Sequence, residues 1–392
     1  MGKGSRGGGV VLPVQTCRLM IVQEDILDSI PISQPNLGAL ERKYLMDAFD
    51  SGWISSIGRY IDEFEKAFAA YCGVSHAVAV SNGTVALHLA LEALGIGPGD
   101  EVVVPDLTFV STANVVRHAG AAAVLVDVER ETMCMDPVAF ERAITPRTKA
   151  VIPVHLYGHP ADMQRISAVA ERHGIKVIED AAEAHGAEIE GKRVGSFGYC
   201  AAFSFYGNKL ITTGEGGMIL AEDGDFAARL RILRDHGMSK TKKYWHTEVG
   251  YNYRMTNMQA AIGLAQVQRA DELIAGRMAV IDRYRARLDG LRGVALNPCK
   301  VGCKNTYWML CLSCDRWDEA ARDGFMAEMK QRGVDTRPFF YPISDMPMYE
   351  EGAAPTPVTH ELSYRGLNLP SFVGISDEAI DYICDQVKNI LG

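Results

Sequence analysis

The sequence has no long apolar run and no excess of positive charge, and both absences restrict its function. None of its apolar runs approaches the ~20 residues needed to cross a bilayer, and the run at residues 10–14 is too short for a signal-peptide core. Acidic residues outnumber basic ones by 49 to 40, which gives the 392 residues a net charge of −9. This balance argues against binding to nucleic acid or to a membrane surface. We expect a cytoplasmic globular protein that binds neither.

Cysteine is scarce and irregularly placed. The nine cysteines are an odd number scattered along the chain, which is typical of reduced thiols in a cytosol. Cys311 and Cys314 form a CxxC pair, but they lie inside the apolar run at residues 308–314, which favours a strand over a zinc knuckle. We therefore expect no metal site.

Apolar runs alternate with helical patterns between about residues 40 and 220. The amphipathic segments 85–94 and 163–173 are followed by Gly95 and Gly174, as helix C-termini commonly are. Such alternation predicts βαβ units, with a mainly parallel sheet covered by helices on both faces. The runs expected as strands are 77–80, 101–104, 122–126, 150–154, 176–179, 201–205 and 217–220.

The pattern changes after residue 255, where a smaller α+β lobe is expected. We predict a large α/β domain over residues 31–265, a small C-terminal domain over 266–392, and a partly disordered extension over 1–30 to which we assign no function. No internal repeat is present, which excludes a solenoid. The expected elements of the small lobe are one long helical stretch over 258–288, a strand over 306–312, helices over 317–332 and 377–390, and a Pro-rich loop over 337–347.

Three features follow the predicted strands, at the edge where active sites of parallel α/β sheets lie. The segment SNGT at residues 81–84 opens a helix, whose free N–H groups and positive dipole end can bind phosphate. Asp180 ends a buried strand, where a carboxylate is costly unless it is paired or functional. Lys209 is either a surface residue or a desolvated amine able to form a Schiff base. Each feature alone has an ordinary structural explanation.

Together the three features indicate a site for pyridoxal 5′-phosphate (PLP). The helix N-terminus would bind the phosphate, Asp180 would keep the pyridine nitrogen protonated, and Lys209 would form the covalent link. A dinucleotide-dependent oxidoreductase is the rival enzyme class, because residues 95–100 read GIGPGD. That run follows a predicted helix and precedes a strand, the reverse of the GxGxxG context. A non-enzymatic homologue would be expected to lack the lysine or the acid.

Seven segments resemble those of the DegT/StrS group of nucleotide-sugar aminotransferases, which are fold type I PLP enzymes. They occur in order between about Pro31 and the C-terminus, over more than nine-tenths of the chain. The group implies a large domain with a mainly parallel sheet and a smaller C-terminal α+β domain. The segments are GWISSIGR (52–59), SNGT (81–84), VHLYG (154–158), EDAAE (179–183), SFYGNK (204–209), GYNYRM (250–255) and NLP (368–370).

The resemblance implies a catalytic role for two of these residues. Lys209 would be the Schiff-base lysine, and Asp180 would be the partner of the pyridine nitrogen. Glu183 would lie near the phenolic oxygen of the cofactor, where many relatives carry Gln. Some relatives have His in place of the lysine and dehydrate their sugar. Because this chain keeps Lys209, the resemblance favours transamination over a PLP-fold sugar dehydratase.

The resemblance also implies how the cofactor is held. Gly83, Thr84 and Ser204 would bind the phosphate. Phe109 would stack on the ring, although it reads equally well as a core residue. Asn252 would reach the phosphate from the neighbouring subunit, so the resemblance implies a homodimer with shared active sites. Without the resemblance, Asn252 would be interpreted as a turn residue.

The substrate is expected to be a nucleotide sugar. Segments 53–59, 211–218 and 244–245 are most similar to enzymes that aminate C4 of GDP-4-keto-6-deoxymannose with L-glutamate, for lipopolysaccharide O-antigen synthesis. Tyr341 departs from the His often found in those enzymes, so a UDP- or dTDP-linked sugar stays possible. The candidate substrate contacts, each of which could also be merely a solvated side chain, are Ser56, Arg59, His185, Lys243, Arg337 and Tyr341.

Overall fold

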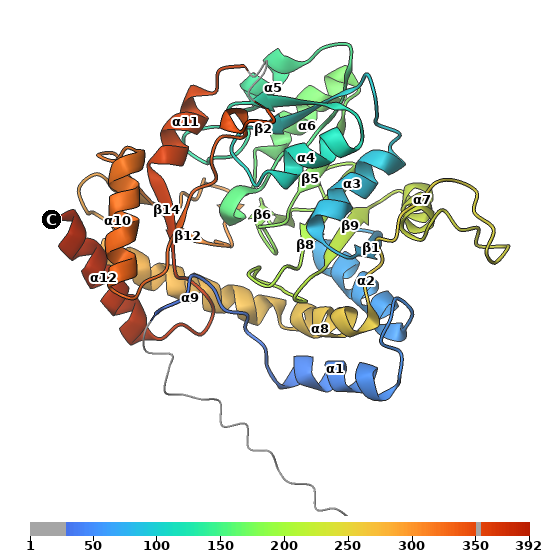
Figure 1. Cartoon of the computed structure of the whole chain (residues 1–392), viewed down its shortest axis with the longest axis horizontal. Helices are drawn as coiled ribbons and strands as arrows, with labels where there is room; N and C mark the ends of the chain where they lie inside the picture. Colours follow the sequence, from blue (N-terminus) through green and yellow to red (C-terminus); the bar gives the residue numbers. More distant parts are fainter. Residues whose placement is uncertain (1–28, 350–353) are drawn as a thin grey trace, which may run out of the picture.

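The computed structural model describes residues 29–349 and 354–392, and a seven-stranded sheet forms its centre (Figure 1). The strand order is β1-β9-β8-β5-β4-β2-β3; the pairs from β8 to β3 are parallel, and β9 is antiparallel to both neighbours. This confirms the mainly parallel α/β fold. The predicted extension lies almost wholly outside the described residues. The strands are β1 (His76–Val80), β2 (Glu101–Pro105), β3 (Ala122–Val126), β4 (Thr148–Val151), β5 (Lys176–Asp180), β8 (Cys200–Ser204) and β9 (Gly217–Ala221).

Helices cover both faces of the sheet, so its strands are buried on both sides. In β1, Val78 and Val80 pack into the core shared with α3, while Ala77 and Ala79 pack into the core shared with α2 and α8. This explains why the strands are continuous apolar runs with no polar alternation. The helices around the sheet are α1 (Ala39–Asp50), α2 (Arg59–Cys72), α3 (Gly83–Ala93), α4 (Ser111–His118), α5 (Pro137–Ala143), α6 (Met163–His173), α7 (Gly224–Arg234) and α8 (Asn257–Gln268).

The C-terminal part forms a second core around a four-stranded antiparallel sheet of order β10-β12-β14-β13. Helix α9 leads into this sheet, and α10 and α12 lie on it (Figure 1). A domain boundary at residues 265/266 stays a prediction. The elements are α9 (Ala270–Leu288), β10 (Val294–Leu296), β12 (Leu310–Cys314), α10 (Glu319–Gln331), β13 (Arg337–Pro338), α11 (Pro357–Tyr364), β14 (Gly366–Leu369) and α12 (Asp377–Leu391).

Two predictions about this part were wrong. The stretch over 258–288 is two helices, because the backbone leaves the helical region at Arg269 (φ −106°, ψ 8°). The strand predicted from residue 306 begins at Leu310, because Tyr307 has a positive φ of 49° that a strand cannot contain. The Pro-rich loop holds the two-residue strand β13 and a 3₁₀ turn at Ile343–Asp345.

Two carboxylates at the ends of large-sheet strands hold residues 344 and 356–359 against that sheet. Asp106, just after β2, is fully buried and accepts hydrogen bonds from the backbone and hydroxyl of Ser344 and from the hydroxyl of Thr356. Asp127, after β3, accepts from the N–H groups of Val358 and Thr359 at the start of α11. An acid at a helix N-terminus satisfies N–H groups that would otherwise be unpaired. The C-terminal chain is thus fixed close to the strand ends of the large sheet.

Two further findings concern the same described residues. No helix among them is both long and apolar enough to cross a membrane. No cluster of His, Cys, Asp or Glu in this part of the chain is arranged to hold a metal ion, and the eight cysteines in it are free. Cys311 and Cys314 lie in β12, as their apolar setting predicts.

Candidate active site

The N-terminus of α3 forms a close-packed turn against the end of β8. The Asn82 side chain caps the helix by accepting from the N–H of Val85 at 3.0 Å. A Cβ at Gly83 would lie 2.7 Å from Cβ of Ser204, so only glycine fits there. The first N–H groups of the helix, at Gly83 and Thr84, have no partner within an α-helix. The structure therefore brings the three predicted phosphate-binding residues together at the positive end of a helix dipole.

Lys209 and Glu183 form a buried pair beyond the ends of β8 and β5. Lys209 Nζ lies 3.7 Å from Glu183 Oε1, and the two side chains are 10% and 5% exposed. Burial lowers the pKa of Lys209, although the carboxylates of Glu183 and Asp180 oppose this effect. Burial also raises the pKa of Glu183. A lysine with a lowered pKa can become a neutral amine near physiological pH, as a nucleophile or general base must.

Asp180 is the last residue of β5 and points into the same buried region. Its Oδ2 accepts from the hydroxyl of Thr112 on α4 at 2.8 Å, and its Oδ1 accepts from the N–H of Ala182 at 3.2 Å. Burial raises the pKa of Asp180, and these two hydrogen bonds oppose that shift. Thr112 was not identified from the sequence, because nothing in a helix-forming segment marks which hydroxyl faces a distant strand.

The residue before Asp180 is also a buried carboxylate, and it holds the strand end in place. Glu179 lies on the other side of the strand and accepts from Nε2 of His155 at 3.0 Å. It also accepts from the N–H groups of Gly195, Phe197 and Gly198. Burial would raise the pKa of Glu179, but these partners together hold it below its ordinary value. The backbone that carries Asp180 is therefore held rigidly by a fully paired ion.

An aromatic side chain that was not identified from the sequence lies against the reactive lysine. The indole of Trp308 has Lys209 Nζ 3.5 Å from its ring centre. The segment around Trp308 was interpreted as an apolar strand, and such a pattern does not reveal that its indole faces Lys209.

PLP fits these residues on three observations. Gly83 and Ser204 form a cradle at a helix N-terminus, as a phosphate requires. Asp180, oriented by Thr112, is an acid suited to a ring nitrogen. Lys209 is a desolvated amine suited to an aldehyde.

Two further residues predicted to hold the cofactor lie outside the buried cluster. Phe109 is 54% exposed, and its ring centre lies 5.9 Å from that of Phe340. Asn252 is exposed between α7 and α8, where its side-chain oxygen accepts from Arg254. Their roles toward the cofactor stay predictions.

Two of the predicted substrate contacts, His185 and Tyr341, contact other residues of the same chain. His185 is buried, and rings of Phe203 and Phe205 lie about it at 5.5 and 5.4 Å. Burial lowers the pKa of His185 to about 3, so it is neutral near pH 7. The hydroxyl of Tyr341 accepts from the buried guanidinium of Arg322 at 3.2 Å. Contact of either residue with a substrate stays a prediction.

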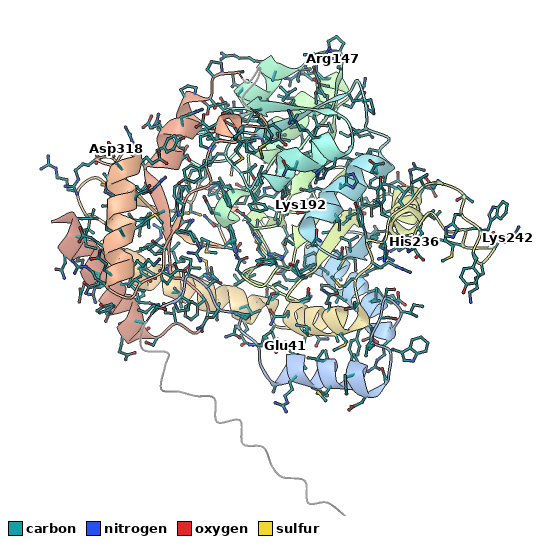
Figure 2. All side chains as sticks on the ribbon, in the orientation of Figure 1. Glu41, Arg147, Lys192, His236, Lys242 and Asp318 are labelled. Carbon is teal, nitrogen blue, oxygen red and sulfur yellow. The ribbon has the colours of Figure 1, made fainter. Side chains whose placement is uncertain are left out.

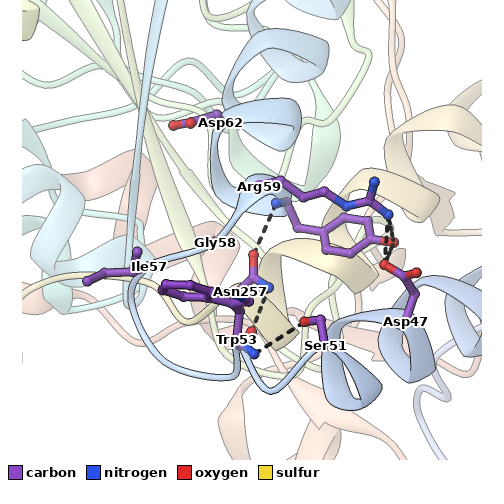
Figure 3. A pocket seen from close by; sticks show the side chains of 9 residues that line it. Asp47, Ser51, Trp53, Ile57, Gly58, Arg59, Asp62 and Asn257 are labelled. Carbon is purple, nitrogen blue, oxygen red and sulfur yellow. Dashed lines mark hydrogen bonds and ion pairs between the residues drawn. The ribbon is translucent and has the colours of Figure 1, made fainter.

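Ser56 lies in the α1–α2 connection, and Arg59 is the first residue of α2. Arg59 lines a surface pocket of about 430 Å³ (Figure 3). Arg59 pairs there with Asp47 at 2.7 Å, and Asn257 links the carbonyl of Trp53 to the N–H of Tyr60. The pocket does not include Lys209, Asp180 or Glu183. No predicted substrate role is tested by this arrangement.

The remaining two predicted contacts are exposed. Arg337 pairs with Asp335 at 2.8 Å. Lys243 lies over the ring of Tyr244 at 5.1 Å, on the segment between α7 and α8. Figure 2 shows that Lys242, beside it, stands at the tip of this segment, away from the body of the chain. The segment thus carries cationic and aromatic side chains outward.

Comparisons with known proteins show which family the chain resembles. The sequence profile of the DegT/DnrJ/EryC1/StrS aminotransferase family matches residues 35–388. A GDP-perosamine synthase of Caulobacter vibrioides is 47% identical and covers 93% of this chain and 99% of its own. One of Vibrio cholerae is 44% identical, with coverage of 92% and 98%. The PLP form of a protein described as a sugar aminotransferase, Spr1654 of Streptococcus pneumoniae, superposes with a TM-score of 0.88 at 27% identity, covering 92% of this chain and 98% of its own.

Proposed function

The chain belongs to the DegT/DnrJ/EryC1/StrS aminotransferase family, and on that basis we propose that it is a GDP-perosamine synthase. It would transfer the amino group of L-glutamate to C4 of GDP-4-keto-6-deoxymannose, with PLP as cofactor. The observation that carries the reaction type is the buried Lys209 amine, 3.7 Å from Glu183. The relatives named above support the choice of sugar.

The described residues account for how the cofactor would be held. The N–H groups of Gly83 and Thr84 and the hydroxyl of Ser204 would bind its phosphate. Asp180 would accept a hydrogen bond from the ring nitrogen, and a protonated nitrogen there would favour the ionised form of Asp180. When bound, PLP supplies an electron-withdrawing ring that acidifies the α carbon of an amino acid.

Lys209 would move the proton that the exchange requires. Its Nζ, kept partly neutral by burial, would take the proton from Cα of glutamate and deliver it to the carbon on the other side of the amino nitrogen. The second half of the cycle would reverse these proton movements on the sugar, leaving nitrogen at C4. Glu183 and Asp180 would limit how far the pKa of Lys209 falls, so that the same nitrogen can serve as base and as acid.

We also propose a homodimer in which Asn252 of one subunit completes the site of the other. The support is that Asn252 lies on an exposed segment, while Trp53, Ile54 and Ile57 expose 57%, 48% and 63% of their surface on one short loop. Apolar groups exposed together in this way are typical of an interface. Lys243 on the same outward segment would supply positive charge for the nucleotide pyrophosphate.

A cytoplasmic location and a role in O-antigen synthesis complete the proposal. The eight described cysteines are free, which fits a reducing compartment. The O-antigen role depends on the identity of the sugar.

The test is a panel of GDP-, UDP- and dTDP-linked 4-keto-6-deoxy sugars, each incubated with enzyme, PLP and L-glutamate, with product mass recorded. We expect the GDP-linked keto sugar to gain an amino group while 2-oxoglutarate appears in equal amount. Turnover of only the UDP or dTDP members would overturn the sugar assignment. A dehydrated product without nitrogen would overturn the reaction type.

A further inference from the structure

The Lys209 amine rests on the face of an indole. Its Nζ lies 3.5 Å from the ring centre of Trp308, a distance at which the electron-rich face attracts an ammonium group. Both side chains are largely buried, with Trp308 7% exposed. Attraction between a cation and an aromatic face is stronger when water is excluded.

Trp308 is held in this position from several sides. Its ring N–H donates to the carbonyl of Asn208 at 3.0 Å, the residue just before the lysine. Its backbone N–H donates to the carbonyl of Tyr157 at 3.1 Å. The Tyr157 ring lies nearly parallel to the indole, with centres 6.1 Å apart and planes 13° apart. The indole therefore presents one fixed face to Lys209.

The backbone around Trp308 contains a strained residue and is held by a buried arginine. Tyr307 has a φ of 49°, a left-handed conformation that is uncommon for residues other than glycine. Arg277 on α9, only 4% exposed, donates to the carbonyls of Tyr307 and Trp308. No carboxylate is among these partners of Arg277. Burial lowers the pKa of its guanidinium to about 10. A strained residue and a buried cation both serve to fix one peptide, which is more than packing of an apolar strand requires.

We propose that Trp308 positions Lys209, and that its indole face is the resting place of the amine whenever the amine is not bonded to the cofactor. Glu183 Oε1 lies 3.7 Å from the same amine. A released lysine would otherwise be free to rotate away. Attracted by both the indole and Glu183, it stays within the buried site. This inference rests on the proposed function only for the identity of Lys209 as the cofactor-bonding amine.

The indole face should also favour the protonated form of Lys209. The titratable and charged groups that act on Lys209 are Glu183, Asp180 and His185, and changes at Trp308 leave all three in place. Removing the ring should therefore lower the pKa of Lys209 by about one unit. A purely structural role for Trp308 predicts no such shift.

The experiment measures the pKa of Lys209 in the full-length chain freed of PLP. The protein is labelled briefly with acetic anhydride at a series of pH values, and modification of Lys209 is quantified by peptide mapping. We expect Trp308→Leu to lower the pKa by about one unit and Trp308→Phe, which keeps a π face, to lower it less. The matched control is Trp317→Leu, because Trp317 is equally buried (7%) but packs on Phe325 in the C-terminal core.

Fluorinated tryptophan provides a version of the test that keeps the native shape. Fluorine withdraws charge from the ring face, so the pKa of Lys209 should fall stepwise with each added fluorine in the native sequence and stay constant in Trp308→Phe. An equal pKa in the native and Trp308→Leu proteins, or an equal fall in Trp317→Leu, would overturn the proposal. Because labelling requires no turnover, this result stands apart from the sugar panel, whose failure would instead count against the proposed function.

Discussion

Lys209 Nζ and Glu183 Oε1 lie 3.7 Å apart in a region where both side chains are at least nine-tenths buried. Each group therefore has a large effect on the protonation of the other. The N–H of Tyr157 donates to the second oxygen of Glu183 at 2.8 Å and fixes the carboxylate. Glu183 is thus an oriented acid that, together with Asp180, raises the proton affinity of the lysine.

Replacing Glu183 by Gln should move the titration of the lysine–cofactor bond to lower pH. The negative charge that favours the protonated nitrogen is lost, so we expect the apparent pKa of the visible absorbance to fall by about one unit. The measurement is a pH titration of the PLP-bound enzyme. Glu215→Gln, at an exposed position six residues after Lys209, serves as the control and should titrate as the native protein does. An unchanged midpoint in Glu183→Gln would show that the acid does not act on the lysine.

Replacing Asp106 by Asn should destabilise the chain by about 2–3 kcal/mol. The buried carboxylate accepts from Ser344 at 2.7 Å through both its N–H and its hydroxyl, and from Thr356. The side-chain amide of Asn would place an N–H group opposite hydrogen-bond donors of Ser344 or Thr356, so at least one of these hydrogen bonds would be lost. The check is the free energy of unfolding from denaturant titration, with the exposed Asp282→Asn as a control expected within about 0.5 kcal/mol of the native value. Equal free energies of unfolding for the two variants would show that Asp106 does not hold the C-terminal chain against the large sheet.

The buried imidazole of His185 should make stability fall with acid. Its pKa is lowered from 6.5 to about 3 in the folded chain, so the unfolded state binds a proton first as pH falls. The contribution of neutral His185 to stability is fully present above pH 6.5 and is lost progressively toward pH 3. Between pH 7 and pH 5 the native free energy of unfolding should fall by about 2 kcal/mol more than that of His185→Gln. Parallel curves for the two proteins would show that His185 does not titrate in this way.

Mixed subunits test the shared site. If Asn252 of one subunit serves the partner, Lys209→Ala and Asn252→Ala should each be inactive alone. A mixture refolded together should recover about a quarter of native activity, because half the dimers are mixed and each has one intact site. Light scattering verifies the dimer. Activity of Asn252→Ala alone, or no recovery in the mixture, would argue against sharing.

The parts of the fold that the sequence predicts well are those with regular hydrophobic patterns. All seven predicted strands correspond to strands of the central sheet, within about three residues at their ends. Asp180, the last residue of β5, and Lys209, five residues after β8, were singled out from the sequence because buried polar groups are costly unless they are paired or used. The break between helices α8 and α9 at Arg269 could not be predicted, since the helical pattern of the sequence continues across it.

The contacts that the sequence could not predict join residues distant in the chain. Thr112 and Asp180 are 68 positions apart, and Asp106 and Thr356 are 250 apart. Trp308 was hidden for a different reason, because the positive φ at Tyr307 turns an apolar run out of strand conformation. Such contacts depend on the tertiary structure, which local patterns do not contain.

The most direct test of this account is borohydride reduction of the PLP-bound enzyme followed by peptide mapping. We expect one pyridoxyl adduct per chain, on the peptide that contains Lys209, and loss of that adduct if L-glutamate is added before reduction. An adduct on any other lysine, or none, would contradict the assignment of Lys209 and the mechanism built on it.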